Sequence, residues 1–103
     1  MNDLPKSPDD CETMIEVRAG VDATDRALIE LFATRFCYMR AAARIKPTRD
    51  AVRDEERKRA VIEAATAHAS AIGVPTAVVA EMWEVLVEAS IAYEMDEWER
   101  LRG

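Results

Sequence analysis

The feature that most limits the fold is a continuous stretch, residues 13–46, which contains no proline and a single glycine, Gly20. Its apolar side chains recur every three or four residues, which predicts one long helix. Such a helix is about 50 Å long at about 1.5 Å per residue, whereas a compact domain of about 100 residues has a radius of gyration of about 13 Å. The apolar positions are Met14, Val17, Val21, Leu28, Phe32, Phe36, Met39 and Ala43.

Two shorter helices follow. Pro47 disfavours helix at the residue before it, so the long helix is expected to end at residue 45 or 46. A second helix is predicted from about Arg53 to Ile72, because acidic residues lie near its start and Gly73 can terminate it. A third is predicted to open at residues 74–76 and to run nearly to the end of the chain.

The N-terminal residues give a weaker signal. Ser7, Pro8 and Asp10 fit a helix start, with Ser7 as the cap and Asp10 at the capping-box position, or else a separate short turn. No segment alternates with a period of two, so no strand is predicted. The expected fold is all-α: a single domain, residues 1–103, with residues 1–12 as an N-terminal extension and one long N-terminal helix.

The long helix also predicts self-association. Two shorter helices of the same chain cannot cover its whole apolar stripe, so the remainder must meet another protein surface. A second copy of the chain supplies a stripe of matching length. We therefore expect a homodimer whose chains intertwine.

Composition excludes several classes of protein. The chain of 103 residues has 20 acidic and 14 basic residues and a net charge of -6, which argues against a general nucleic-acid binder. The start lacks a cationic segment followed by an apolar run, and no window is long and apolar enough for a membrane span, so the cytoplasm is expected. Cys11, Cys37 and His68 show no metal-ligand spacing, so we expect free thiols and no metal.

Three cations on the long helix need an explanation. Arg18, Arg35 and Lys46 fall within or at the margin of the apolar stripe. Arg35 and Lys46 share a face about 16 Å apart, so their long side chains could grip one small ligand. Arg18 lies about 26 Å from Arg35 along the axis, too far to join that site within one chain. An antiparallel partner helix would bring its own Arg18 alongside.

The other helices offer further polar groups. Ser90 and Glu94 are four residues apart on the apolar stripe of the third helix. Arg57 lies on the same face of the second helix as His68, and Asp54 precedes Arg57 by three residues. Several cations with one hydroxyl and one acid suit a small dianionic substrate, because guanidinium groups bind carboxylates through paired hydrogen bonds.

In order and spacing these residues resemble the all-helical (AroQ-class) chorismate mutases and their relatives, the isochorismate pyruvate lyases, over nearly the whole chain. The segments that carry the resemblance are Ile15-Glu16-Val17-Arg18, Val21-Asp22-Ala23-Thr24-Asp25, Leu28-Ile29-Glu30-Leu31-Phe32-Ala33-Thr34-Arg35, Ala42-Ala43-Arg44-Ile45-Lys46, Val52-Arg53-Asp54-Glu55-Glu56-Arg57, and Ser90 with Glu94.

The resemblance implies a dimer of three-helix chains with two sites and no cofactor. Each site would take one arginine, Arg18, from the neighbouring chain. Arg35 and Arg57 would bind substrate carboxylates. Asp54 and Ser90 match family positions that line the ring and carboxylate regions.

Lys46 and Glu94 would act on the reacting bond. By resemblance, Lys46 binds the ether oxygen between the ring and the enolpyruvyl group, with a carboxylate contact as well, and Glu94 matches a second donor to that oxygen. Chorismate would rearrange to prephenate through a concerted transition state that puts negative charge on the ether oxygen. Positioning and electrostatics then suffice, without a nucleophile or a general base.

Two positions depart from the commonest family pattern. Many bacterial members carry glutamine where this chain has Glu94, although others, fungal ones included, carry glutamate. Only a protonated Glu94 could donate a hydrogen bond to the ether oxygen. Lys58 stands where many mutases carry a glutamate that meets the ring hydroxyl. With the Glu97-Trp98 ending, Lys58 leaves the lyase reaction, isochorismate to salicylate and pyruvate, as an alternative.

Simpler interpretations of the charged residues also exist. Arg18, Arg35 and Lys46 could be interface cations paired with Asp22 or Asp25. A non-catalytic helical dimerisation module is therefore a second alternative.

The other candidates have structural interpretations too. Arg57 could form an ordinary surface ion pair, Asp54 could be a helix-start charge, and Ser90 could be a small polar filler. The pathway stays open between aromatic amino-acid biosynthesis, salicylate or siderophore biosynthesis, and another secondary pathway.

Overall fold

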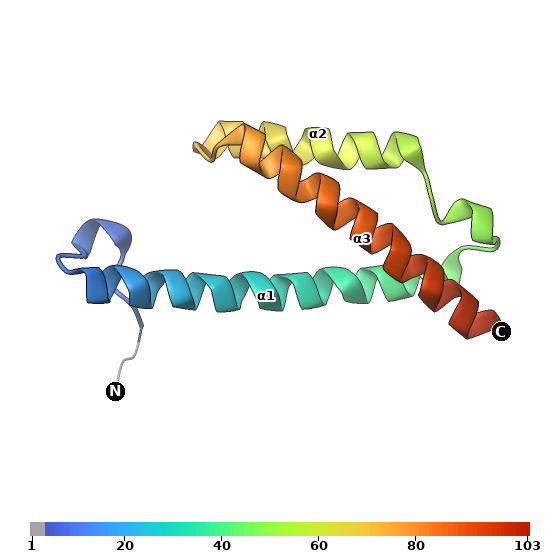
Figure 1. The fold of residues 1–103 in the computed structure, drawn as a ribbon, viewed down its shortest axis with the longest axis horizontal. Coiled ribbons are helices and arrows are strands. Elements are labelled where there is room, and N and C mark those ends of the chain that lie inside the picture. Colours follow the sequence, from blue (N-terminus) through green and yellow to red (C-terminus); the bar gives the residue numbers. More distant parts are fainter. Residues whose placement is uncertain (1–3) are drawn as a thin grey trace. The chain divides into compact units, whose positions relative to one another are not determined.

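A computed structural model describes residues 4–103 as three α-helices and two short 3-10 turns (Figure 1). No strand occurs in that range, so the all-α prediction with a long first helix is confirmed. In chain order the elements are η1 (Pro8–Asp10), α1 (Met14–Ile45), η2 (Arg49–Ala51), α2 (Glu55–Ile72) and α3 (Thr76–Arg102).

The chain divides into two compact units. The first comprises the described residues 4–36, and the second comprises residues 37–103. The division falls inside α1, after Phe36.

In the first unit, α1 begins with a capping box that the sequence analysis missed. The Thr13 hydroxyl accepts from the Glu16 N–H at 3.2 Å, and the Glu16 carboxylate accepts from the Thr13 N–H at 3.1 Å. This reciprocal pair satisfies donors that a helix start leaves open. Lys6 pairs with the same carboxylate at 2.6 Å. That contact, followed by bonds from backbone N–H groups, lowers the pKa of Glu16 to about 2.

The capping role expected of Ser7 is wrong, and the alternative of a separate short turn is confirmed. The Ser7 hydroxyl donates to an Asp10 carboxylate oxygen at 3.0 Å and does not cap the backbone. The backbone closes the turn instead, because the Asp10 N–H bonds the Ser7 carbonyl. Residues 8–10 are therefore a single 3-10 turn ahead of α1.

The first unit leaves much of its apolar stripe uncovered. Val21 is 51% exposed and Leu28 is 44% exposed, and both lie on the predicted stripe. Met14 and Val17 on the same stripe are exposed as well. None of residues 4–36 is buried.

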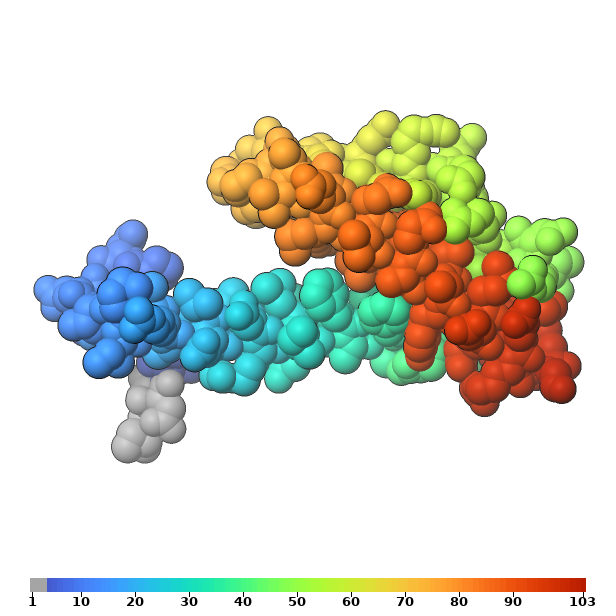
Figure 2. All heavy atoms as spheres, viewed as in Figure 1, coloured from blue at the N-terminus to red at the C-terminus, as the bar shows by residue number. Residues whose placement is uncertain are grey.

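The second unit is built on a hairpin of α2 and α3, which pack against each other (Figure 2). α2 begins at Glu55, two residues later than predicted, because Asp54 acts as its N-cap: the Asp54 carboxylate accepts from the Arg57 N–H at 3.0 Å. Gly73 ends α2 as predicted, with a φ of 81° that suits glycine.

The core of the second unit consists of small aliphatic side chains, namely those of Ala43, Val52, Ala69, Val79 and Val87.

Cys11 in the first unit and Cys37 in the second are both free thiols. No helix of residues 4–103 is long and apolar enough to cross a membrane.

Candidate functional site

The centre of the candidate site is a contact between the end of α1 and the middle of α3. Lys46 follows directly after α1, and its Nζ lies 2.7 Å from Oε2 of Glu94. The same ammonium donates to the Val52 carbonyl at 3.3 Å. Two of the predicted site residues are therefore in direct contact.

Glu94 is an unusual carboxylate because it is 4% exposed. Its Oε2 meets Lys46 at ion-pair distance, yet it accepts no well-aligned hydrogen bond from the described residues. A buried acid is costly unless it is paired. Glu94 therefore depends on Lys46, whose side chain remains 30% exposed and can reach a ligand.

Ser90 lies one helical turn before Glu94 on the buried face of α3. It is 3% exposed, and its hydroxyl donates to the Leu86 carbonyl in its own helix at 2.7 Å. The prediction that Ser90 and Glu94 share a face is confirmed. The bond within the helix also agrees with a filling role for the Ser90 side chain.

Asp54 and Arg57 lie at the start of α2, just after Val52, which Lys46 contacts. Asp54 caps the helix, so its interpretation as a helix-start charge is supported by the structure. The Arg57 side chain is exposed, and no carboxylate of residues 4–103 forms an ion pair with it. The surface ion pair considered for Arg57 is therefore not observed in that part of the chain.

Arg18 and Arg35 belong to the first unit. Arg18 is exposed, and across the described residues it forms no ion pair with Asp22 or Asp25. Arg35 is half-buried. The structure thus brings together Lys46 and Glu94, with Ser90, Asp54 and Arg57 in the same unit, whereas the roles of Arg18 and Arg35 stay predictions.

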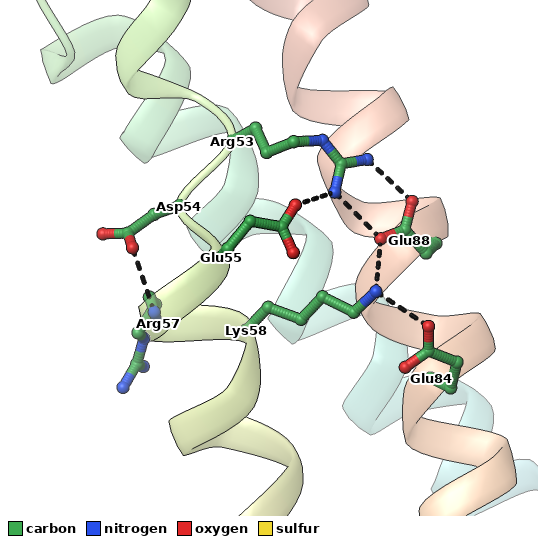
Figure 3. Close-up of polar contacts among 7 residues, drawn as sticks. All are labelled: Arg53, Asp54, Glu55, Arg57, Lys58, Glu84 and Glu88. Carbon is green, nitrogen blue, oxygen red and sulfur yellow. Dashed lines mark hydrogen bonds and ion pairs between the residues drawn. The ribbon is translucent and has the colours of Figure 1, made fainter.

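Lys58 joins a separate network between α2 and α3 (Figure 3). Its ammonium contacts Glu84 and Glu88, each at 2.7 Å, and Arg53 also binds Glu88. Arg53 first, then Lys58, lowers the pKa of Glu88 to about 2, while the two glutamates raise the pKa of Lys58. In Figure 3 the Asp54 and Arg57 side chains point away from this network.

Two residues near the end of α3 were missed by the sequence analysis. The Trp98 indole N–H donates to the Lys46 carbonyl at 3.0 Å, and the Arg102 guanidinium donates to the same carbonyl at 2.8 Å. Part of the signal was present in Pro47: because proline has no N–H, the Ala43 carbonyl four residues earlier lacks its usual donor, and Arg102 donates to it at 2.9 Å.

Comparison with known proteins gives two matches. The chorismate mutase type II family matches residues 17–95. An isochorismate pyruvate lyase of Pseudomonas aeruginosa is 26% identical to this chain over 98 residues, which cover 95% of this chain and 97% of the relative. The family match includes every predicted site residue from Arg18 to Glu94.

Proposed function

Since the chain belongs to the chorismate mutase type II family, we propose that it is a chorismate mutase, an isomerase that converts chorismate to prephenate. The single observation that carries this proposal is the contact of Lys46 with the buried Glu94. A cation and a protonated acid held together at the edge of an apolar core can both donate hydrogen bonds to an oxygen on which negative charge develops.

Lys46 is proposed to stabilise the transition state. As the carbon–oxygen bond of chorismate breaks and the carbon–carbon bond forms, negative charge grows on the ether oxygen. An ammonium aimed at that oxygen binds the transition state more strongly than the ground state, which lowers the barrier. The atoms balance because the product is an isomer of the substrate.

Glu94 is proposed as a second donor to the ether oxygen. It can donate only when protonated, since a carboxylate offers acceptors alone and would repel the developing charge. Without substrate, its partner is the Lys46 ammonium. Substrate binding would replace that contact, and Glu94 would then act in its neutral form.

The arginines are proposed to bind the two substrate carboxylates. Arg57 suits this role because its exposed guanidinium has no ion pair in the described part of the chain. Arg35 would contribute from the same chain, and Arg18 from the partner chain. Asp54 and Ser90 are proposed to line the ring and carboxylate regions.

A homodimer is proposed as the functional form. Val21 and Leu28 remain exposed on the stripe of α1 within the first unit, where a second copy would cover them. If Arg18 acts across the interface, then each site is incomplete in a single chain.

The experiment supplies purified protein with chorismate and, separately, with isochorismate. We expect consumption of chorismate with formation of prephenate. A folded protein that turns over neither compound would contradict the proposal and would favour a non-catalytic dimerisation module. Prephenate should not form in a matched Lys46→Ala sample above about 1% of the wild-type rate.

A second candidate is isochorismate pyruvate lyase activity, which forms salicylate and pyruvate. Two observations favour it. The chain is similar to the Pseudomonas aeruginosa lyase. Lys58 occupies the position at which many mutases carry a glutamate that meets the ring hydroxyl, and its ammonium is bound by Glu84 and Glu88 instead. Salicylate is fluorescent, so it is detected directly in the isochorismate sample. A larger kcat/KM for isochorismate than for chorismate would make the lyase the principal activity.

A further inference from the structure

We propose that Trp98 and Arg102 are positioning residues, which hold the backbone of Lys46 and so aim its ammonium at the reacting oxygen. The inference rests on the proposed function of Lys46. It adds two residues, outside the range matched by the family, that need not touch substrate.

The end of α1 lacks donors of its own. In an α-helix each carbonyl accepts from the N–H four residues later. The Lys46 N–H bonds the Ala42 carbonyl in this way at 2.9 Å. The Ala43 carbonyl faces position 47, where Pro47 has no N–H. Because Ala43 is 0% exposed, its carbonyl needs a donor from another part of the protein.

Arg102 supplies that donor. Its Nη1 donates to the Ala43 carbonyl at 2.9 Å, and its Nη2 donates to the Arg44 carbonyl at 3.3 Å and to the Lys46 carbonyl at 2.8 Å. A positive charge also suits the negative end of the helix dipole. One guanidinium thus binds three carbonyls, two in the last turn of α1 and one directly after it.

Trp98 completes the arrangement. Its indole N–H donates to the Lys46 carbonyl at 3.0 Å, and its ring lies 4.4 Å from the Arg102 guanidinium carbon. A guanidinium over an indole is favourable, so each residue orients the other. The Lys46 carbonyl consequently accepts from two donors.

Trp98 and Arg102, the two anchors of the Lys46 backbone, lie on the same helix as Glu94, which contacts the Lys46 side chain. Glu94, Trp98 and Arg102 are spaced four residues apart, so they occupy one face of α3. Glu94 contacts the side chain of Lys46, while Trp98 and Arg102 hold its backbone. Without the anchors the Lys46 backbone can shift relative to Glu94, and a misplacement of about 1 Å can cost about 10²-fold in rate.

The main experiment measures kcat and KM for Arg102→Gln and Trp98→Phe, per mole of folded protein. We expect kcat to fall about 10- to 100-fold for Arg102→Gln and less for Trp98→Phe, with KM changed less than about threefold. Arg102→Lys keeps the charge but not the planar guanidinium with its several N–H donors, so its kcat should lie between those of wild type and Arg102→Gln.

The matched control is Arg100→Gln. Arg100 lies on the same helical turn and pairs with Glu97 in its own helix, so the charge change is the same but no carbonyl of α1 is lost. Its kcat should equal that of wild type. A loss as large as that of Arg102→Gln would overturn the inference, because charge alone would then explain both.

A double variant separates positioning from general stability. A residue that acts through Lys46 has nothing to position once Lys46 is removed, so Arg102→Gln should cause no further loss in a Lys46→Ala background. An additional loss equal to that in the wild-type background would overturn the inference.

Indole hydrogen exchange gives a readout that needs no activity. Trp83 in α3 is half-buried, and within residues 4–103 its indole N–H donates no hydrogen bond, unlike that of Trp98. The Trp98 indole proton should therefore exchange more slowly than that of Trp83 in wild type, and faster in Arg102→Gln than in wild type. Equal exchange of the two indoles in wild type would contradict the hydrogen bond from Trp98 to the Lys46 carbonyl. Absence of turnover by wild type would overturn the proposed function, whereas an active enzyme whose Arg102→Gln variant keeps its kcat would overturn this inference alone.

Discussion

The first unit, residues 4–36, has no buried side chain, whereas the second, residues 37–103, contains a small core and two buried polar residues. Both units are helical, and both carry predicted site residues. They differ in packing: α2 and α3 pack against each other around the small core, although Val78, Met82 and Val85 on α3 stay exposed. In the first unit Val21 and Leu28 stay exposed and no core forms. A helix of this length is stabilised chiefly by packing of its apolar face, so we expect the first unit to pack against a further surface, which the proposed second chain would supply.

The same contrast extends to the site. Lys46 and Glu94 are held by contacts within the second unit. Arg18 lies in the first unit, exposed like the apolar residues around it. If a second chain covers that surface, then it also completes the site.

The largest effect is expected for Lys46→Ala in the second unit. Removing one donor to a developing oxyanion costs about 10² to 10³ in rate, so kcat should fall by that factor. Because Lys46 also neutralises the buried Glu94, the variant should lose stability as well. Steady-state kinetics beside thermal unfolding separates the losses, and Lys46→Arg, which keeps the charge, is the matched control. A kcat within about threefold of wild type would exclude Lys46 from catalysis.

The next effect is expected for Leu28→Asp in the first unit. A buried charge at the centre of an interface should weaken self-association by about 30-fold or more, as for a change of about 2 kcal/mol. Analytical ultracentrifugation over a concentration series measures it. Ala19→Asp makes the same charge change about 180° around the helix and should leave association intact. If both variants behave as wild type does, then the stripe is not the interface.

A smaller, pH-dependent effect is expected for Glu94→Gln. Only a protonated carboxyl at position 94 can donate to the ether oxygen, so activity that depends on this donor falls with rising pH, whereas glutamine donates at every pH. The variant should therefore have a flatter profile of kcat against pH, with a difference of about tenfold at the alkaline end. Parallel profiles for the two proteins would remove the donor role of Glu94.

The smallest effect concerns stability and the network in Figure 3. Arg53 and Lys58 lower the pKa of Glu88 from 4.5 to about 2, so the folded state favours its ionised form. This contribution is present above about pH 4.5 and is lost as the pH falls toward about 2. The Tm advantage of wild type over Glu88→Gln should therefore shrink below about pH 4.5.

The control for that experiment is Glu81→Gln. Glu81 is an exposed carboxylate on the same helix, and in residues 4–103 it takes part in no ion pair. Its Tm difference from wild type should be small at every pH. A difference for Glu88→Gln that stays constant from pH 7 to about 3 would show that the network does not stabilise the fold through ionised Glu88.

Local patterns predicted most of the fold. The proline-free stretch, Pro47 and Gly73 defined where two helices end, because these signals act within a few residues. The start of α2 was misjudged because Asp54 fits both a helix interior and a cap, and the structure uses it as a cap. The Thr13–Glu16 capping box was also readable, as a threonine three residues before a glutamate.

The site was less accessible from the sequence. Helical spacing placed Ser90 and Glu94 on one buried face, which the structure confirms. The anchoring of Lys46 by Arg102 joins residues 56 positions apart, and no local pattern contains such a contact. The single-domain organisation, the dimer and the roles of Arg18 and Arg35 stay predictions, since they concern surfaces beyond one unit of one chain.

The most direct test of the shared site mixes two inactive variants, Arg18→Ala and Lys46→Ala, under conditions that allow subunits to exchange. In a mixed dimer one site receives Arg18 and Lys46 intact, while the other loses both. Random pairing makes half of the dimers mixed, so the account predicts about a quarter of wild-type activity from two proteins that are each nearly inactive. A mixture with no more activity than the average of its components would contradict the account.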